Sequence, residues 1–378
     1  MKITDIQAHL IDIPLPKEHH YAWVPGSAVK SIKFTLVKIF TDEGITGFGA
    51  SHICFGEEIV HSVHNLLKPF LVGKDPLATE RHIETIYSAR YFGTPLWLVD
   101  QALWDIVGKA AGQPLYKLWG GFQDKILAYG APSEPRSLQE HREIVHHYLE
   151  KGFKAIKLRL HNEDPKDDLA LVEAVRDEVG DRMEIMVDAN QALLLNSPKP
   201  HPVWSYERAL MMARELEKLK VYYLEEPLYI YNFKGIAQLT QETDIYIAGG
   251  EWNGPIHEFK WLLDQGCYDI LQPDAMQSDG LFRMRQIAHM AYLENKLFIP
   301  HTWGNGLGLV ANLQVALSVP NCPFFEYPYD PETLSVEINQ AMIQEPLRVD
   351  AEGYLHAPKG PGLGVELNED FIRRHTLR

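Results

Sequence analysis

Cysteine is scarce in this sequence, with three residues in 378. Cys54, Cys267 and Cys322 lie far apart along the chain, so they suggest neither a disulfide framework nor the closely spaced thiolates of a zinc site. Disulfides accumulate in oxidising compartments. The scarcity therefore favours a reducing compartment, and we expect a cytoplasmic protein.

Long apolar runs are also missing. None reaches the roughly 20 residues that a membrane-spanning helix needs, and the first residues, Met1 to Asp5, lack the apolar core of a signal peptide. Positive charge is in deficit, since 36 Lys and Arg face 51 Asp and Glu for a net charge of −15. This balance argues against nucleic acid or an anionic membrane as a partner. A small anionic substrate remains compatible, because a bound cation can invert the local field.

The first part of the chain predicts a small antiparallel sheet followed by helices. Residues 3–13 and 32–41 alternate apolar and polar side chains, and a turn then leads into a third strand that ends near residue 50. Apolar residues recur at helical spacing in the segments 57–72, 79–91 and 97–112. A domain boundary is expected just before residue 125.

From residue 126 onward, short apolar runs alternate with amphipathic segments. Strands are expected at 126–131, 153–159, 184–188, 221–224, 245–249, 268–272, 296–300 and 323–327. The clearest helices between them are at 138–151, 165–179 and 205–219. Eight parallel strands with right-handed helical crossovers close into a (β/α)8-type TIM barrel, whose catalytic groups lie at the carboxyl ends of the strands.

Three of these strands end in an acid. Asp188, Glu225 and Glu251 each follow a short apolar run, and their spacing of about one strand–helix unit brings them to one rim of the barrel. Any one acid alone is better explained as a solvated loop charge. Three oxygen donors on adjacent strands suit a hard divalent cation, most commonly Mg²⁺.

The other strand ends also carry reactive groups. Lys157 and Arg159 share one face of the second strand, Asp274 and His301 end the sixth and seventh strands, and Glu326 lies on the eighth. An isolated histidine is more often structural. Here the neighbouring Asp274 can fix the tautomer of His301 and raise its basicity, so we expect His301 to be a general base.

A metal and a base at one rim point to abstraction of a proton next to a carboxylate. This step places a second negative charge on the carboxylate, which a bound cation and positioned donors must stabilise. We expect Lys157 and a protonated or hydrogen-bond-donating Glu326 to share that task.

The segment between the first two strands, residues 14–31, is long enough to be a functional lid rather than an inert excursion. Its two adjacent histidines offer no defined metal geometry. The expected substrate contacts on the lid are His19, His20, Tyr21 and Trp23, and those on the barrel are Asn190, Trp252, Asn253, Trp303, Tyr327 and Tyr329.

Taken together, these motifs resemble the mandelate racemase subgroup of the enolase superfamily over essentially the whole chain. The resemblance rests on Val187-Asp188-Ala189-Asn190-Gln191, Glu225-Glu226-Pro227, Gly250-Glu251, Pro273-Asp274-Ala275-Met276 and Pro300-His301, and on the Ala102-Leu103-Trp104-Asp105-Ile106 helix. It implies an α+β capping domain at 1–124, a modified (β/α)7β barrel at 125–346 and a segment at 347–378 that returns to the capping domain. Lid loops at 14–31 and around Ser51-His52-Ile53 would set substrate choice.

The resemblance also assigns roles. Asp188, Glu225 and Glu251 match the ligands of one Mg²⁺ per subunit, Asp274 and His301 match the His–Asp dyad, and Glu326 matches the glutamate that stabilises the enolate. The use of a Lys or His base with Mg²⁺ is the general pattern of this superfamily. A homo-oligomer that acts on a small sugar acid is expected.

One departure from the family pattern is informative. The family usually has Lys-x-Lys on the second barrel strand, and this chain has Arg159 in place of the second lysine. Guanidinium stays protonated, so it is a poor base and a good anion clamp. With His301 as the ordinary base, we expect a dehydratase that converts an aldonate or aldarate into a 2-keto-3-deoxy acid.

Three other functions remain open. Lys157 could compensate for the missing base in a racemase or epimerase. A lactone cycloisomerase uses the same enolate, and a binding or regulatory protein could have kept the barrel and lost turnover.

Overall fold

The computed structural model describes residues 1–53, 56–90, 95–193, 198–199 and 202–377. Cys54 and the predicted end of the second helix at residue 91 therefore lie outside the described residues. The two other cysteines, Cys267 and Cys322, are free and buried. No helix in the described part of the chain is long and apolar enough to cross a bilayer.

The chain opens with a three-stranded antiparallel sheet in the order β1 (Ile3–His19), β2 (Val29–Thr41), β3 (Thr46–Ala50). The first two strands are longer than the alternation predicted, because their pairing continues past Pro14 to His19 opposite Val29, with a bulge between. The connection between them therefore spans only residues 20–28. This corrects the expected lid of residues 14–31.

The predicted helices follow the sheet. They are α1 (Glu57–Ser62), η1 (Val63–Leu67) and α2 (Lys68–Leu71), then α3 (Thr79–Arg90) and α4 (Trp97–Ala111). A short helix that was not predicted, α5 (Leu115–Leu118), comes next. Helix α4 lies directly on β3, because Gly47 and Gly49 lack side chains. A Cβ atom on Gly47 would approach the carbonyl oxygen of Ala102 to 2.0 Å.

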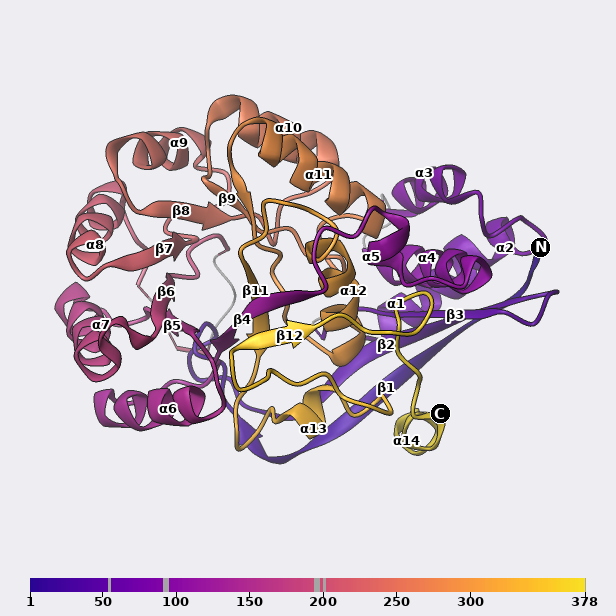
Figure 1. Cartoon of the computed structure of the whole chain (residues 1–378), viewed down its shortest axis with the longest axis horizontal. Helices are drawn as coiled ribbons and strands as arrows, with labels where there is room; N and C mark the ends of the chain where they lie inside the picture. Colours follow the sequence, from indigo (N-terminus) through magenta and orange to yellow (C-terminus); the bar gives the residue numbers. More distant parts are fainter. Residues whose placement is uncertain (54–55, 91–94, 194–197, 200–201, 378) are drawn as a thin grey trace.

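A parallel barrel forms the larger part of the molecule (Figure 1). Its strands are β4 (Lys125–Ala131), β5 (Ala155–Arg159), β6 (Glu184–Asp188), β7 (Val221–Glu225), β8 (Tyr246–Gly249), β9 (Ile270–Leu271), β10 (Leu297–Phe298) and β11 (Phe324–Pro328). They are linked by helices α6 (Leu138–Glu150), α7 (Pro165–Val179), α8 (Tyr206–Lys218), α9 (Phe233–Glu242), α10 (Ile256–Gln265), α11 (Leu281–Leu293) and α12 (Gly306–Ala316), with a short η2 (Gly180–Arg182) before β6. Seven strand–helix units and a final strand give the expected (β/α)7β fold.

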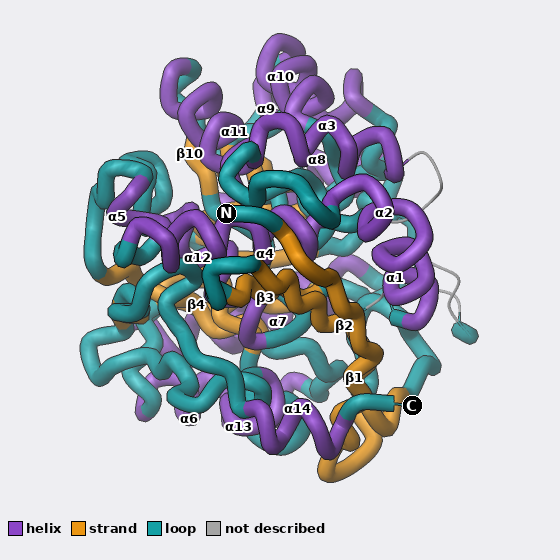
Figure 2. Tube along the Cα trace, turned by 90° about the vertical axis from the view of Figure 1, so that its right-hand side faces the viewer, coloured by secondary structure: helices purple, strands orange, loops and turns teal. Residues whose placement is uncertain are grey.

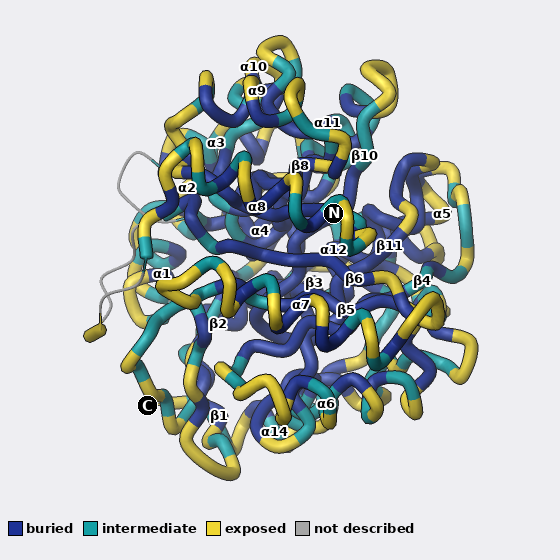
Figure 3. Tube along the Cα trace, turned by 90° about the vertical axis from the view of Figure 1, so that its left-hand side faces the viewer, coloured by how far each residue is buried: buried dark blue, intermediate teal, exposed yellow. Residues whose placement is uncertain are grey.

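The ladders run in the order β10-β9-β8-β7-β6-β5-β4-β11. The amide of Phe298 at the end of β10 donates to the carbonyl of Asn321 just before β11, at 3.0 Å. This contact links the two ends of the ladder. Most residues of the barrel strands are buried, which Figure 3 shows in dark blue, because helices cover their outer faces.

Alternation along the strands decides which side chains face the barrel interior. The interior cluster contains Ala155 of β5, Met186 of β6, Tyr223 of β7 and Phe324 of β11. Two residues further along the same strands lie Lys157, Asp188, Glu225 and Glu326, which are fully or almost fully buried. The expected catalytic residues therefore occupy the last interior positions before the carboxyl rim.

The C-terminal segment contacts both parts of the molecule. After α13 (Val336–Asn339), β12 (Tyr354–His356) pairs antiparallel with β4 of the barrel. The chain then crosses to the first domain, where Leu363 donates to Asp105 of α4 at 2.8 Å. Helix α14 (Glu369–His375) lies beside β1 (Figure 2), and the amide of Leu377 donates to the carbonyl of Leu10. The exact domain boundaries stay a prediction.

A buried acid joins α4 to the barrel. One carboxylate oxygen of Asp100 accepts a hydrogen bond of 2.8 Å from the amide of Leu281, the first residue of α11. Burial raises the pKa of Asp100 to about 7, although the bond from Leu281 works in the opposite direction.

We predict that Asp100→Asn changes the pH dependence of stability. Between about pH 4 and pH 7 the folded chain holds a proton that the unfolded chain has released, so the wild type loses stability as the pH rises through this window. The variant lacks this loss. The melting temperature of the variant minus that of the wild type, measured by calorimetry, should therefore increase by about 2 °C per pH unit over this window.

The exposed Asp181, changed to Asn, serves as the control. If the difference between Asp100→Asn and wild type stayed constant from pH 5 to pH 7, burial of the charged form would not govern this contact.

Candidate active site

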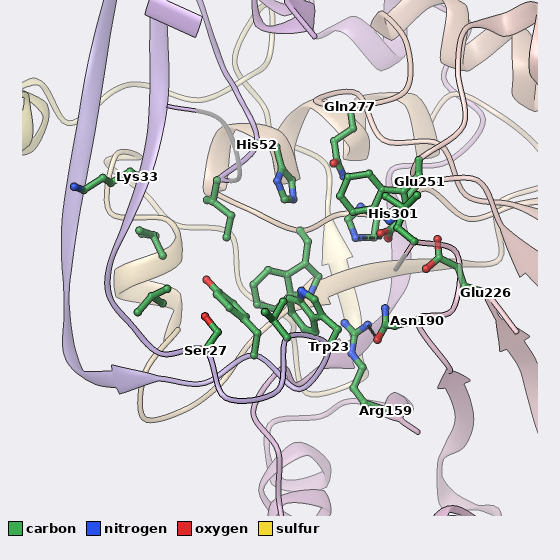
Figure 4. Close-up of a pocket in the computed structure, with 18 of the residues that line it drawn as sticks. Trp23, Ser27, Lys33, His52, Arg159, Asn190, Glu226, Glu251, Gln277 and His301 are labelled. Atoms are coloured by element: carbon green, nitrogen blue, oxygen red, sulfur yellow. Dashed lines mark hydrogen bonds and ion pairs between the residues drawn. The ribbon is translucent and has the colours of Figure 1, made fainter. Parts of the chain in front are cut away.

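A cavity of about 540 Å³ lies at the carboxyl ends of the barrel strands (Figure 4). The barrel contributes Arg159 and His301, the β1–β2 connection contributes Tyr21 and Trp23, and the segment after β3 contributes His52. The cavity therefore lies between the small sheet and the barrel rim.

Lys157 lies among three carboxylates inside the barrel. Its Nζ is 2.7 Å from Glu326, 2.9 Å from Glu225 and 3.8 Å from Asp188. Burial alone would lower the pKa of Lys157, but the charges of Glu225 and Glu326 outweigh it and the pKa is raised. Lys157 is thus paired as a cation with these carboxylates in this arrangement.

Arg159 extends from the same face of β5 to the cavity. Its guanidinium forms an ion pair with Asp188 and donates to Asn190 Oδ1 at 3.2 Å. It also lies 4.6 Å from the ring centre of Trp23, at cation–π distance. Burial opposes the charge, but Asp188 and other acids raise the pKa of Arg159. The residue can clamp an anion but cannot accept a proton.

His301 and Asp274 form the expected pair. His301 Nδ1 is 2.9 Å from Asp274 Oδ2, and the second oxygen of Asp274 accepts from the amide of Met276 at 2.7 Å. Nε2 lies 2.8 Å from Glu251. Burial would lower the pKa of His301, but Glu251 and Asp274 raise it. The dyad thus presents Nε2 to the rim where Glu251 lies.

Asp188, Glu225 and Glu251 offer the carboxylate oxygens that a divalent cation prefers. In the barrel ladder Asp188 is paired with Glu225, and Glu225 with Ala248, three residues before Glu251. Within the described residues, however, no three His, Cys, Asp or Glu side chains are arranged closely enough to hold a metal ion. Lys157, Arg159 and His301 occupy the acids' oxygens instead.

The balance of charge favours a cation at this rim. Six buried acids face the three basic groups Lys157, Arg159 and His301; the acids are Asp188, Glu225, Glu226, Glu251, Asp274 and Glu326. Burial raises the pKa of Asp188, Glu225 and Glu226, and repulsion from neighbouring acids adds to it, although Arg159 and Lys157 lower the pKa of Asp188. A divalent cation would relieve this repulsion, so the residues fit the Mg²⁺ assignment.

Glu326 differs from the expectation. Its carboxylate pairs with Lys157 and accepts from the amide of Thr302 at 2.8 Å. Burial would raise its pKa, but Lys157, His301 and Arg159 lower it. In this structure the Glu326 carboxylate is thus an acceptor, and its expected role as a donor to the enolate stays a prediction.

Several expected substrate contacts do line the cavity. They are Tyr21, Trp23, Asn190, Trp252 and Trp303. The ring centres of Tyr21 and Trp23 are 4.9 Å apart, and that of Trp23 is 5.1 Å from that of Trp303. An aromatic wall thus joins the β1–β2 connection to the segment after β10.

Two lid residues do not reach the cavity, which corrects the prediction for both. His19 is buried at the end of β1, where its ring nitrogens lie 2.7 Å from Thr333 Oγ1 and 3.0 Å from Ser133 Oγ. His20 is exposed and borders a separate groove with Lys17 and Arg136. The extended β1 strand explains both positions.

Three barrel residues also lie elsewhere. Tyr327 follows Glu326 on β11 and so points to the opposite face, where its hydroxyl donates to the carbonyl of Leu347 at 2.7 Å. The hydroxyl of Tyr329 lies 2.9 Å from His147 Nε2. The side-chain amide of Asn253 donates to Glu258 Oε1 at 2.8 Å. None of the three is among the residues that line the cavity in the described structure.

The cavity also has lining residues for which no role was expected from the sequence, among them Glu226 and Gln277. His52 of the expected second lid segment lines it as well. Burial lowers the pKa of His52 to about 4, so this ring is neutral. Glu226 was visible as the second acid of the Glu225-Glu226 doublet, whereas Gln277 had no signal in the sequence.

Comparison with known proteins defines the family. Residues 140–371 match the enolase C-terminal domain-like family, and residues 16–120 match the mandelate racemase / muconate lactonizing enzyme N-terminal domain. The chain belongs to this family, which confirms the resemblance seen in the sequence and the fold class.

Individual relatives span the whole chain. It is 32% identical to an arabinonate dehydratase of Saccharolobus solfataricus, over 94% of each chain. It is 29% identical to a D-galactarolactone cycloisomerase of Agrobacterium fabrum, over 100% of this chain and 99% of that one. A racemase structure from Streptomyces coelicolor with bound magnesium superposes with a TM-score of 0.85 at 26% identity, covering 99% of this chain and 100% of that one.

We predict that Glu251→Gln weakens Mg²⁺ binding by at least about 10-fold, because a neutral amide oxygen replaces a charged hard ligand. Titration calorimetry with MgCl₂ measures this without any substrate. Glu294→Gln, a change at an exposed glutamate, is the control and should bind Mg²⁺ as the wild type does. Equal Mg²⁺ affinity in Glu251→Gln and wild type would remove Glu251 from the ligand set.

Proposed function

We propose that this chain is a Mg²⁺-dependent dehydratase of a sugar acid, an aldonate or an aldarate. It removes the proton α to the carboxylate and eliminates the β-hydroxyl as water, and the resulting enol becomes a 2-keto-3-deoxy acid. The similarity to an arabinonate dehydratase and to D-galactonate dehydratases supports this reaction class.

One observation carries the proposal. His301 is tied to Asp274 through Nδ1 and directs Nε2 to Glu251 at the rim. Lys157 and Arg159 on β5 are ion-paired with Glu225 and Asp188. Of the three basic groups, the imidazole is the one whose ordinary pKa lets it exchange a proton near neutral pH. A racemase of this family needs a proton acceptor on each face of the α-carbon. Dehydration needs a single acid–base residue when both groups leave from one face.

The residues divide the work as follows. His301 Nε2 accepts the α-proton and then returns a proton to the departing β-hydroxyl, while Asp274 holds the ring in the required tautomer. Arg159 holds the substrate carboxylate by its guanidinium. A Mg²⁺ held by Asp188, Glu225 and Glu251 would stabilise the second negative charge of the enolate. The rings of Trp23 and Trp303 form an apolar wall beside these groups.

A cycloisomerase is the second candidate, because the relatives at 29% and 26% identity include a D-galactarolactone cycloisomerase and a 3,6-anhydro-α-L-galactonate cycloisomerase. In that reaction the same α-proton leaves, but the β-oxygen that departs is part of a ring. No water is released. The mass of the product therefore separates the two reactions.

A panel of mono- and diacid sugars, incubated with Mg²⁺, tests the proposal. A dehydratase releases a 2-keto acid that has lost one water, a cycloisomerase gives a product of unchanged mass from a lactone, and a racemase changes optical rotation alone. Mass spectrometry and a carbonyl reagent distinguish these outcomes.

We predict that His301→Asn lowers kcat/KM by about 10²- to 10⁴-fold, the usual contribution of a general acid–base residue. Mg²⁺ affinity should stay within about twofold, because His301 is not among the proposed ligands. His356→Asn, a change at an exposed histidine, is the control. Turnover at the wild-type rate in His301→Asn would overturn the role of the dyad.

For Arg159→Lys we expect epimerisation at the α-carbon to appear beside a dehydration rate reduced by roughly 10-fold. A lysine can release its proton and return it to the second face, whereas guanidinium cannot. Proton NMR in D₂O follows label at C2 of the epimer. Arg159→Gln, which removes the clamp without adding a base, is the matched control. A folded, substrate-binding Arg159→Lys with no more epimer than Arg159→Gln would contradict the clamp assignment.

A further inference from the structure

Gln277 lines the cavity with an amide that the described structure leaves unused. Both its Oε1 and its Nε2 are buried, and neither forms a hydrogen bond to any described residue. Figure 4 shows the side chain directed toward Glu251 and His301. The indole Nε1 of Trp303, another lining residue, is buried without a partner among the described residues as well.

The backbone of Gln277 is fixed on both sides. Its N–H donates to the carbonyl of Asp274 and its carbonyl accepts from the indole of Trp97, each at 3.0 Å. The next residue, Ser278, accepts from the amide of Asp274 at 3.0 Å and donates to the carbonyl of Glu251 at 3.0 Å. The turn that carries Gln277 is therefore hydrogen bonded to Asp274, the partner of His301, and to Glu251, a proposed metal ligand.

A buried amide without partners costs free energy that a suitable ligand can recover. The amide offers one acceptor and two donor hydrogens, and a hydroxyl group can both donate and accept. An anionic group fits poorly here, because Glu226 and Glu251 line the same cavity. A neutral hydroxyl is the ligand that uses both ends of the amide.

The remaining wall is mixed, and the polar side chains of Ser27, Ser31, Lys33 and His52 lie beside apolar ones. Val24, Ile32, Ile53 and Leu193 line the cavity with aliphatic side chains, and Tyr21, Trp23, Trp252 and Trp303 add aromatic rings. Among the described lining residues, Gln277 is the one with both a hydrogen-bond donor and an acceptor buried and unpartnered. Gln277 is thus positioned to select which hydroxyl is accepted.

We propose that Gln277 determines substrate specificity by hydrogen bonding one hydroxyl of the sugar acid that does not react, at C4 or beyond, with Trp303 Nε1 as a second donor. The amide cannot transfer a proton, so its role is to hold the chain while His301 acts at C2 and C3. This inference rests on the proposed function, since it takes the ligand to be a sugar acid.

A cycle of protein and substrate changes tests the proposal. The sugar acid that the panel identifies is compared with its 4-deoxy and 5-deoxy analogues, in wild type, Gln277→Leu, Trp303→Phe and the control Gln265→Leu, whose glutamine is exposed on α10. With the full substrate, Gln277→Leu should lower kcat/KM roughly 5- to 20-fold, as expected for one lost hydrogen bond. With the deoxy analogue that lacks the bonded hydroxyl, Gln277→Leu should lower kcat/KM less than about twofold.

Three results would overturn the proposal. The first is an equal loss of kcat/KM in Gln277→Leu with every substrate, which indicates a structural role. The second is an unchanged kcat/KM in Gln277→Leu with all substrates. The third is a difference between full substrate and deoxy analogue that Gln265→Leu shows to the same extent. If Gln277→Leu does not fold by circular dichroism, Gln277→Asn, which keeps the amide but shortens its reach, replaces it in the same cycle with the same criteria.

Binding separates this inference from the proposed function. Dissociation constants measured by calorimetry with Mg²⁺ in a His301→Asn background give the same cycle without turnover. Sugar acid that binds but is not dehydrated by the wild type would overturn the dehydratase proposal alone. If the wild type is active but Gln277→Leu changes the dissociation constants of the full and deoxy substrates equally, the Gln277 proposal alone is overturned. Failure of every sugar acid to bind would overturn both proposals.

Discussion

The structure depends on a surplus of buried negative charge at the rim of a parallel barrel. The register of β6 and β7 places Asp188 beside Glu225, and the alternation of β5 directs Lys157 between them. Carboxylates this deep in a protein are stable only when they are paired or bound to a cation. Lys157, Arg159 and His301 supply part of that compensation, and a divalent cation would supply the rest.

The same constraint divides the basic residues into different roles. Lys157 and Arg159 are held between acids, and their raised pKa values keep them charged. His301 is also hydrogen bonded to an acid, Asp274, but its ring can lose a proton at a pH at which a guanidinium cannot. This difference in chemistry, together with position, makes the imidazole the natural acid–base residue of the site.

The β1–β2 connection couples the small sheet to this chemistry. Trp23 lies on Arg159, which in turn contacts Asp188, so three elements meet at one guanidinium. His19 fixes the base of the connection through Ser133 and Thr333. A substrate that displaces Trp23 would therefore change the surroundings of Arg159, the residue proposed to hold the substrate carboxylate. The expected homo-oligomer and cytoplasmic location stay predictions.

Much of this arrangement could be predicted from the sequence, because strands that end in acids or in Pro300-His301 carry local signals. The eight barrel strands followed from the alternation of apolar runs with amphipathic segments. The position of His19 could not be predicted, since a bulge carries β1 past Pro14 and no local pattern marks it. Tyr327 was assigned to the site although its neighbour Glu326 already occupied the interior face. Gln277 became visible only through the missing partners of its amide, which are a property of tertiary packing.

The most direct test follows the hydrogen on the α-carbon. A sugar acid that the enzyme converts is prepared with deuterium at C2, and the product formed in H₂O with Mg²⁺ is analysed by NMR. We expect a primary isotope effect on kcat/KM and a 2-keto product without deuterium at C3, because the deuterium taken from C2 leaves with the β-hydroxyl as water. The absence of an isotope effect, or transfer of the deuterium from C2 to C3, would contradict abstraction of the α-proton by His301.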